Sequence, residues 1–223
     1  MIWEANTVSA VLLPTIRRPF LRPTSCPGRL SRNSQRSGER FWQQSAVRHC
    51  EQILAEYCGK PVVEHAVETV VLSLVDGVSV VTGYDSERVK PALDDHATEC
   101  IENTDNNTGQ STSVRAGVRA VRAHNADAIL ILLGDMPSVA VRSLDLLIEA
   151  YYGGVSNITV AAVDRRCVNP VPLDASLFGE LTTMDGNVGG KELFSKNNSV
   201  AVETGDESIC RDIDSLNDLH NDE

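Results

Sequence analysis

The sequence lacks the features that mark membrane, disulfide-rich and zinc-binding proteins. Its 223 residues contain no apolar run near the roughly 20 residues needed to cross a bilayer. The apolar stretch 8–13 is too short for the core of a signal peptide, and Glu4 stands where such a peptide carries positive charge. The six cysteines form no CxxC pair, which argues against a zinc site or a disulfide framework. We therefore expect a cytoplasmic protein with no membrane partner.

Lysine is absent from the first 50 residues, where eight arginines and two glutamates give a net charge of +6. Because the whole chain carries −11, residues 51–223 carry −17. Acidity of this size argues against a nucleic-acid partner for the main body, because carboxylates repel phosphates. It also keeps a surface hydrated at high salt, so we expect a halophilic protein from a salt-rich cytoplasm.

Residues 51–223 alternate short apolar runs with helical periodicities, in a composition that is ordinary for a globular domain. The pattern predicts strands at 78–82, 99–102, 128–133 and 158–163, and helices over 63–71, 86–93, 111–124 and 143–150. Strands and helices that alternate at this spacing indicate an α/β fold with a Rossmann-like, doubly wound and mostly parallel sheet.

Residues 1–50 follow a different pattern. A first strand is expected at 8–13, and residues 14–48 are then rich in Arg, Ser and Pro without a sustained period. This composition predicts disorder or an unusually long loop. A mitochondrial transit peptide is also rich in Arg and Ser, but the strand-like start and the acidic body argue against that alternative. We therefore divide the chain into an aberrant basic segment that contains the first strand (1–50) and a main domain (51–223).

Asp135 is the most informative residue of the main domain. It lies in the turn Gly134-Asp135-Met136-Pro137, directly after the buried strand expected at 128–133. Ligands of open α/β sheets bind beyond the carboxyl ends of the strands. A carboxylate at that place suits a Mg²⁺ ion that in turn holds phosphates. The alternative is a turn aspartate that caps the next helix.

Four further segments extend this pattern along the chain. They are the polar loop 103–113, the sequence VNPV at 168–171 with DGNVGGKELF at 185–194, the sequence DIDSLNDL at 212–219, and LAEYCGKPVVEHA at 54–66. Together with GDMP at 134–137, their order and spacing closely resemble the molybdenum-cofactor nucleotidylyltransferases, the MobA-like NTP transferases. The resemblance covers roughly residues 52–220. It implies a Rossmann-like fold that uses Mg²⁺ to couple a nucleotide to a phosphorylated acceptor, with release of pyrophosphate.

The resemblance also assigns roles to single residues. It implies Asp135 and Asp214 as catalytic residues and Asp135, Asp212 and Asp214 as metal contacts. It places Asn103, Gly109, Ser113 and Gly134 at the nucleotide, and Asn169, Pro170, Gly189 and Lys191 at the acceptor. Carboxylates with Mg²⁺ neutralise the charge that develops between the α-phosphate and pyrophosphate. Taken alone, DIDSLNDL also fits a capping box that starts a terminal helix.

The expected function is a nucleotidylyltransferase that transfers CMP or GMP from CTP or GTP to a molybdopterin-like acceptor. A molybdenum hydroxylase is the expected partner for the product, and sugar phosphates or a deazaflavin precursor are alternative acceptors. A second alternative is a catalytically impaired protein that binds a nucleotide or cofactor. A third is a glycosyltransferase, although its DxD pair normally lies near mid-chain and the pair here is Asp212 with Asp214.

One hallmark of the family is missing. The resemblance calls for a loop LAAGxSxRxGxxK after the first strand, which binds triphosphate through backbone N–H groups, one Arg and one Lys. Here Pro14-Thr15-Ile16 follows the strand, and Gln52 stands at the position of the lysine. We hypothesise that residues 14 to about 50 are the product of an out-of-frame reading, which all three frames of the coding DNA would test. Each lost charge-assisted contact costs about 1.5–3 kcal/mol, so turnover is expected to be impaired.

Overall fold

The computed structural model describes residues 10–17, 51–83, 86–105, 110–154, 156–164, 166–183, 193–194, 196–213 and 218–220. Most of the basic segment 14–50 lies outside these residues, and the domain boundary at residue 50 stays a prediction. Four of the predicted site residues, Gly109, Gly189, Lys191 and Asp214, also lie outside them. In the part of the chain that is described, no helix combines the length and apolar character needed to cross a membrane.

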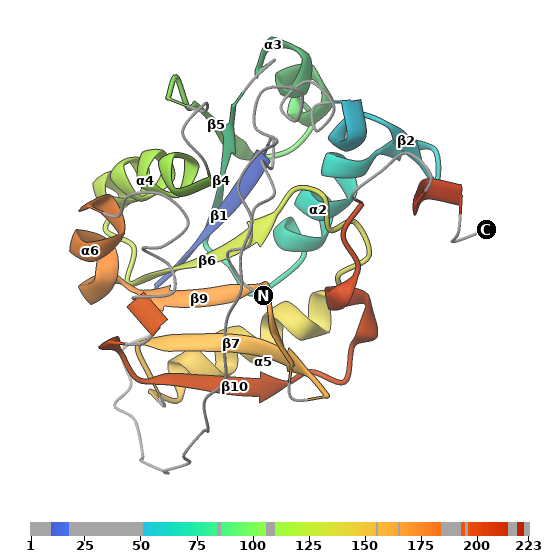
Figure 1. Ribbon diagram of the computed structural model, residues 1–223. Coiled ribbons are helices and arrows are strands. Elements are labelled where there is room, and N and C mark those ends of the chain that lie inside the picture. Colours follow the sequence, from blue (N-terminus) through green and yellow to red (C-terminus); the bar gives the residue numbers. More distant parts are fainter. Residues whose placement is uncertain are drawn as a thin grey trace, which may run out of the picture.

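An eight-stranded sheet forms the centre of the molecule (Figure 1). Its strands are β1 (Ala10–Ile16), β4 (Gly77–Thr82), β5 (Thr98–Glu102), β6 (Ala128–Leu133), β7 (Ile158–Val163), β8 (Arg166–Val168), β9 (Val171–Asp174) and β10 (Ser199–Glu203). Seven of them are ordered β10-β7-β9-β6-β1-β4-β5, and β8 pairs with β7. A separate hairpin consists of β2 (Glu56–Tyr57) and β3 (Lys60–Pro61).

Strand direction follows the expected fold in most of the sheet. Strands β4, β5, β6, β7 and β10 share one direction, whereas β1, β8 and β9 run the opposite way. We call the side at which the five co-directional strands end the carboxyl side of the sheet. The α/β, Rossmann-like and mostly parallel sheet predicted from the sequence is confirmed. The expected strand 128–133 is β6 and is buried throughout, although its two immediate neighbours, β1 and β9, are antiparallel to it.

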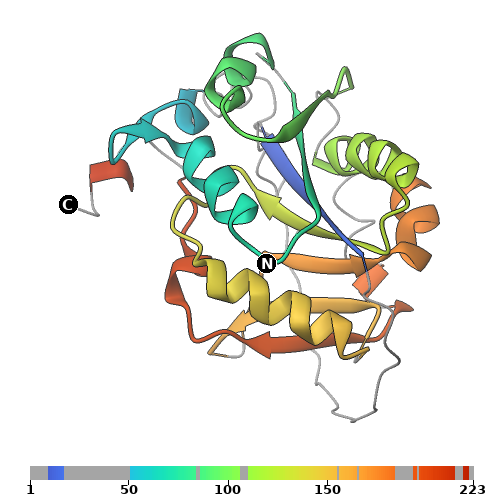
Figure 2. The same ribbon diagram turned by 180° about the vertical axis from the view of Figure 1, so that it is seen from behind.

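Four helices make the sheet doubly wound. Helices α2 (Val62–Val71) and α5 (Val141–Tyr152) pack on one face and contribute to one apolar core (Figure 2). Helices α4 (Gln110–Val121) and α6 (Phe178–Thr183) contribute to the core on the other face. The remaining short helices are α3 (Ser86–Val89), η1 (Lys90–Leu93), η3 (Arg122–His124), η4 (Ala175–Leu177), η5 (Glu207–Cys210) and η6 (Asp218–His220). The predicted helices are thus found, with ends that coincide or are shifted by up to three residues, and the stretch 86–93 is divided between α3 and η1.

Strand β1 is the predicted first strand, but it extends to Ile16, so residues 14–16 belong to the strand and not to the predicted loop. It also runs in the unexpected direction. Ala10 pairs with Thr82 at the end of β4, while Ile16 pairs with Ala128 at the start of β6. Arg17 then donates its backbone N–H to Asp76, just before β4, at 2.7 Å. The chain therefore leaves β1 on the side opposite to Asp135. Both faces of β1 are apolar, with Leu12 in one core and Leu13 in the other, so its side chains are buried in either direction.

Candidate functional site

The turn after β6 presents a buried carboxylate at the carboxyl side of the sheet. Asp135 is 3% exposed and Met136 is 4% exposed, and the Met136 N–H donates to the Leu133 carbonyl at 3.4 Å. Helix α5 begins six residues later at Val141. A carboxylate withdrawn from water this far requires compensation by polar groups or a cation. Asp135 thus lies where the sequence predicts the metal contact, and Gly134, a predicted nucleotide contact, precedes it in the same turn. The role of each stays a prediction.

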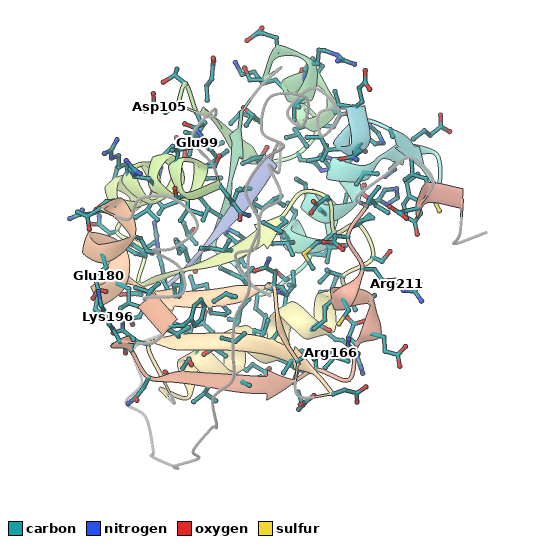
Figure 3. The ribbon with its side chains drawn as sticks, in the orientation of Figure 1. Glu99, Asp105, Arg166, Glu180, Lys196 and Arg211 are labelled. Atoms are coloured by element: carbon teal, nitrogen blue, oxygen red, sulfur yellow. The ribbon has the colours of Figure 1, made fainter. Side chains whose placement is uncertain are left out.

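The C-terminal acidic segment lies directly against this turn. The backbone N–H of Ile213 donates to the backbone carbonyl of Asp135 at 2.9 Å, and the Ile213 side chain is 5% exposed. Asp212 is exposed beside it, next to Arg211, which Figure 3 shows on the segment that follows β10. Asp214 lies outside the described residues. The structure therefore brings together two acidic segments that are 77 positions apart in the chain.

Asp206 fastens the same C-terminal segment to the start of α5. Its Oδ2 accepts hydrogen bonds from the Ala140 N–H at 3.2 Å and the Ser143 hydroxyl at 2.7 Å, and its Oδ1 accepts one from the Ser208 N–H at 3.1 Å. Burial acts to raise the pKa of Asp206, but these hydrogen bonds outweigh it and hold the pKa below its usual value. Sequence reasoning missed this residue. The available signal was the spacing Asp206-Glu207-Ser208, which is typical of a side chain that caps a helical turn.

The start of α4 forms a second polar region at the carboxyl side. Asn103 follows β5, and its side-chain amide donates to the hydroxyls of Thr112 at 2.8 Å and Ser113 at 3.0 Å. The structure therefore brings together Asn103 and Ser113, two of the predicted nucleotide contacts. Gly109, between them in the sequence, is outside the described residues. Because Asn103 and Ser113 bind each other, their observed contacts position the helix, and any contact with a nucleotide stays a prediction.

Ser111 is a candidate that sequence reasoning missed. It is 2% exposed, and its hydroxyl is buried without a hydrogen-bond partner among the described residues. It lies in the first turn of α4, where free backbone N–H groups and the helix dipole favour an anion. The polar run Gln110-Ser111-Thr112-Ser113, buried on all four residues, was the available signal in the sequence.

The predicted acceptor contacts Asn169 and Pro170 reach the same side of the sheet. They join β8 to β9, and β9 begins opposite Ile131, near the end of β6. Pro170 is buried and its carbonyl accepts the Ala161 N–H at 3.2 Å, whereas Asn169 is half-buried. The peptide bond between them is cis. Gly189 and Lys191, the other two predicted acceptor contacts, lie outside the described residues.

The position of the expected phosphate-binding lysine is filled by a buried neutral side chain. Gln52 is 7% exposed, and its backbone carbonyl accepts a hydrogen bond from the Ala55 N–H at 3.1 Å. The reversed direction of β1 also carries the residue after it, Arg17, to the side opposite to Asp135, where its guanidinium donates to the His124 carbonyl at 2.9 Å. The described residues therefore combine a buried acidic turn, an exposed Asp212 and a polar helix start. This set suits a divalent cation with an anionic ligand, and among the described residues the phosphate loop of the resemblance is not rebuilt.

Comparison with known proteins gives the family. The MobA-like NTP transferase domain model matches residues 48–201. Nicotine blue oxidoreductase from Paenarthrobacter nicotinovorans is 26% identical over 175 residues, which is 75% of this chain and 85% of that protein.

Solved structures show the same fold. A nucleotidyl transferase from Methanothermobacter thermautotroptrophicus has a TM-score of 0.64 and 25% identity, over 76% of this chain and 82% of that one. The manganese complex of Rv0371C from Mycobacterium tuberculosis H37Rv has a TM-score of 0.60 and 21% identity, over 76% of this chain and 89% of that one. The family model covers well over half of the chain. The chain therefore belongs to the MobA-like NTP transferase domain family.

Proposed function

We propose that this protein is a Mg²⁺-dependent nucleotidylyltransferase that transfers CMP or GMP from CTP or GTP to molybdopterin. One observation carries the proposal: the hydrogen bond from Ile213 to Asp135 puts the DID segment beside the buried carboxylate of the GDMP turn. The acceptor's phosphate oxygen attacks the α-phosphorus, and the bond to the β-phosphate breaks so that pyrophosphate leaves. The product would pass to a molybdenum hydroxylase, and the reaction belongs in the cytoplasm, where nucleoside triphosphates are made. The acidic composition of the protein suits a salt-rich cytoplasm.

The residues present fit a magnesium ion. Mg²⁺ prefers oxygen ligands, usually one or two carboxylates with water and substrate phosphates. Asp135 would supply a buried carboxylate, and Asp212 would supply a second from the adjacent segment. Asp214, outside the described residues, stays a predicted ligand. When bound, the ion would neutralise charge on the α-phosphate and the leaving pyrophosphate. The manganese complex of the mycobacterial relative supports a divalent ion in this fold.

The chain's own residues would orient the nucleotide. The first turn of α4, with the buried Ser111 hydroxyl, lies at the carboxyl side, and the start of a helix favours an anion. Asn103 holds that turn in place through Thr112 and Ser113. The segment that contains Asn169 and Pro170 faces the acceptor in this proposal. Molybdopterin is chosen over other phosphorylated acceptors on the resemblance of VNPV and DGNVGGKELF to the family's motifs.

A second candidate is a protein that binds the nucleotide or the cofactor without turning it over. Gln52 at the lysine position and Arg17 on the far side of β1 favour it, because neither residue puts a positive charge beside the triphosphate. The two candidates share the metal site and differ in the chemical step.

The experiment is a calorimetric titration of CTP and GTP with Mg²⁺ in molar KCl, followed by measurement of pyrophosphate release with molybdopterin. The transferase requires micromolar binding of one nucleotide and release of pyrophosphate. D135N should lower that release by about 10²–10³-fold, while the exposed control D94N should leave it unchanged. Binding without pyrophosphate supports the second candidate, and no binding by the folded protein contradicts both.

A further inference from the structure

A cluster of metal-ligating side chains lies outside the GDMP turn and the start of α4. Glu64 and Glu68 stand one turn apart on α2, and His96 approaches them from the segment between η1 and β5. One ligand atom from each of the three residues lies within 4.8 Å of the other two. None of these residues belongs to the site proposed above.

His96 is the distinctive member of this cluster. Its Nε2 atom is buried and has no hydrogen-bond partner among the described residues, and it lies 3.6 Å from the Glu64 carboxylate. A tetrahedral zinc ion with bonds of about 2.0–2.2 Å separates its ligand atoms by about 3.3–3.6 Å. The observed separation is therefore close to the edge of a zinc coordination tetrahedron, and it is too long for a hydrogen bond.

Glu68, the third residue of the cluster, is the most exposed of the three. The side chains of His96, Glu64 and Glu68 are 15%, 20% and 33% exposed, so the cluster is partly sheltered but open to entry from solvent. Three protein ligands would leave one position for water, as in other open zinc sites.

Lys60 already shows that the cluster attracts a cation. Its ammonium group contacts Glu68 and lies 3.6 Å from Glu64, and the hydrogen bond from Lys60 holds the pKa of Glu68 below its usual value. The Lys60 side chain is 43% exposed, so it can turn into solvent when a doubly charged ion arrives. A metal ion must therefore displace one positive charge that the fold supplies.

We propose that Glu64, Glu68 and His96 bind a zinc ion that joins α2 to the segment entering β5. An imidazole nitrogen with two carboxylates selects zinc over magnesium, which prefers oxygen ligands alone. Binding replaces a proton or the Lys60 ammonium at the carboxylates and uses the neutral form of His96. This site is independent of the proposed nucleotide chemistry.

The test is calorimetric titration of the metal-free, full-length protein with Zn²⁺, together with thermal unfolding. We expect one zinc at this site and a rise in Tm of about 5–10 °C at a zinc concentration about 100 times Kd. H96Q and E64Q should each weaken binding by about 10–100-fold. K60M should tighten it, because the competing ammonium is removed; a merely structural ion-pair cluster predicts no such gain.

Three variants separate this site from other zinc ligands. H124Q removes an exposed histidine that pairs with Glu99 at 3.1 Å, C58S removes an exposed thiol, and D135N alters the site proposed for magnesium. Each should retain wild-type zinc affinity at this site. If the wild-type protein binds no zinc, or if C58S or H124Q abolishes binding while H96Q does not, the proposal is wrong.

Discussion

Gly117 offers a sharp test of how β1 lies in the sheet. This glycine sits in the middle of α4, and a Cβ atom placed on it would lie 1.7 Å from Cδ1 of Leu13 and 2.8 Å from Cγ2 of Val81. Both distances are far below van der Waals contact, so α4 or the side chains beneath it must shift in a G117A variant. The expected destabilisation depends on the Leu13 side chain of β1 facing α4.

The magnitude follows from two opposed effects. Overpacking a filled core costs about 1–3 kcal/mol, and the severe overlap with Leu13 places G117A at the upper end. Replacing glycine by alanine inside a helix returns about 1 kcal/mol. We therefore expect a net loss of about 1–2 kcal/mol, which corresponds to a fall in Tm of about 2–8 °C for a chain of this size.

The assay is urea or thermal unfolding of G117A, L13A and the double variant. L13A alone should cost about 2–5 kcal/mol because it leaves a cavity, but it removes the atom that the new methyl group meets. The double variant should therefore be more stable than additivity predicts, by about 0.5–3 kcal/mol. G179A is the matched control, since a Cβ there meets nothing within 4 Å. If G117A is as stable as wild type and its effect adds to that of L13A, the placement of β1 against α4 is refuted.

Two further predictions concern the carboxyl side of the sheet. D206N should lower stability at pH 7 by about 1–2 kcal/mol, because the charged acceptor of the bonds from Ala140, Ser143 and Ser208 is lost. The folded state holds the pKa of Asp206 below its unfolded value, so this stabilisation is present above the unfolded pKa and is lost as the pH falls through the folded pKa. The difference in unfolding free energy between wild type and D206N should therefore shrink between pH 7 and pH 2. A difference that stays constant over this range would contradict the prediction. S111A should weaken nucleotide binding by about 5–10-fold with Tm nearly unchanged, because the hydroxyl has no partner among the described residues. A large fall in Tm, with unaltered calorimetric affinity, would assign Ser111 a structural role instead.

Several elements followed from local sequence alone. The run of six apolar residues at 128–133 matches β6, and the run at 158–163, in which Thr159 is the one polar residue, matches β7. Both strands are buried at every position, which favours such runs. Helices α4 and α5 were found with ends shifted by one to three residues, since a period of 3.6 is weakest where a helix ends. The order of strand and turn in the sequence was enough to predict that Asp135 lies at the end of β6.

Other features depended on contacts between distant parts of the chain. Asp206 lies 66 positions from the Ala140 N–H that it accepts, so its partner cannot be inferred from its neighbours. His96 meets Glu64 only after α2, β4 and η1 have folded, and the spacing of the three residues gives no metal-binding motif. Ser111 was visible as a polar residue, but its burial came from the packing of α4 on the sheet.

The direction of β1 shows where local information ends. The residues of β1 predicted a buried strand, because both of its faces are apolar. An alternation with a period of two is the same when read from either end, so it defines the faces of a strand and not its direction. Direction was decided by the pairing of β1 with both β4 and β6, which carries Arg17 away from Asp135. The sequence by itself determined the family, the buried strands and the acidic turn. Tertiary pairing decided which side of the sheet the chain reaches after β1, because only the contacts of β1 with β4 and β6 distinguish its two possible directions.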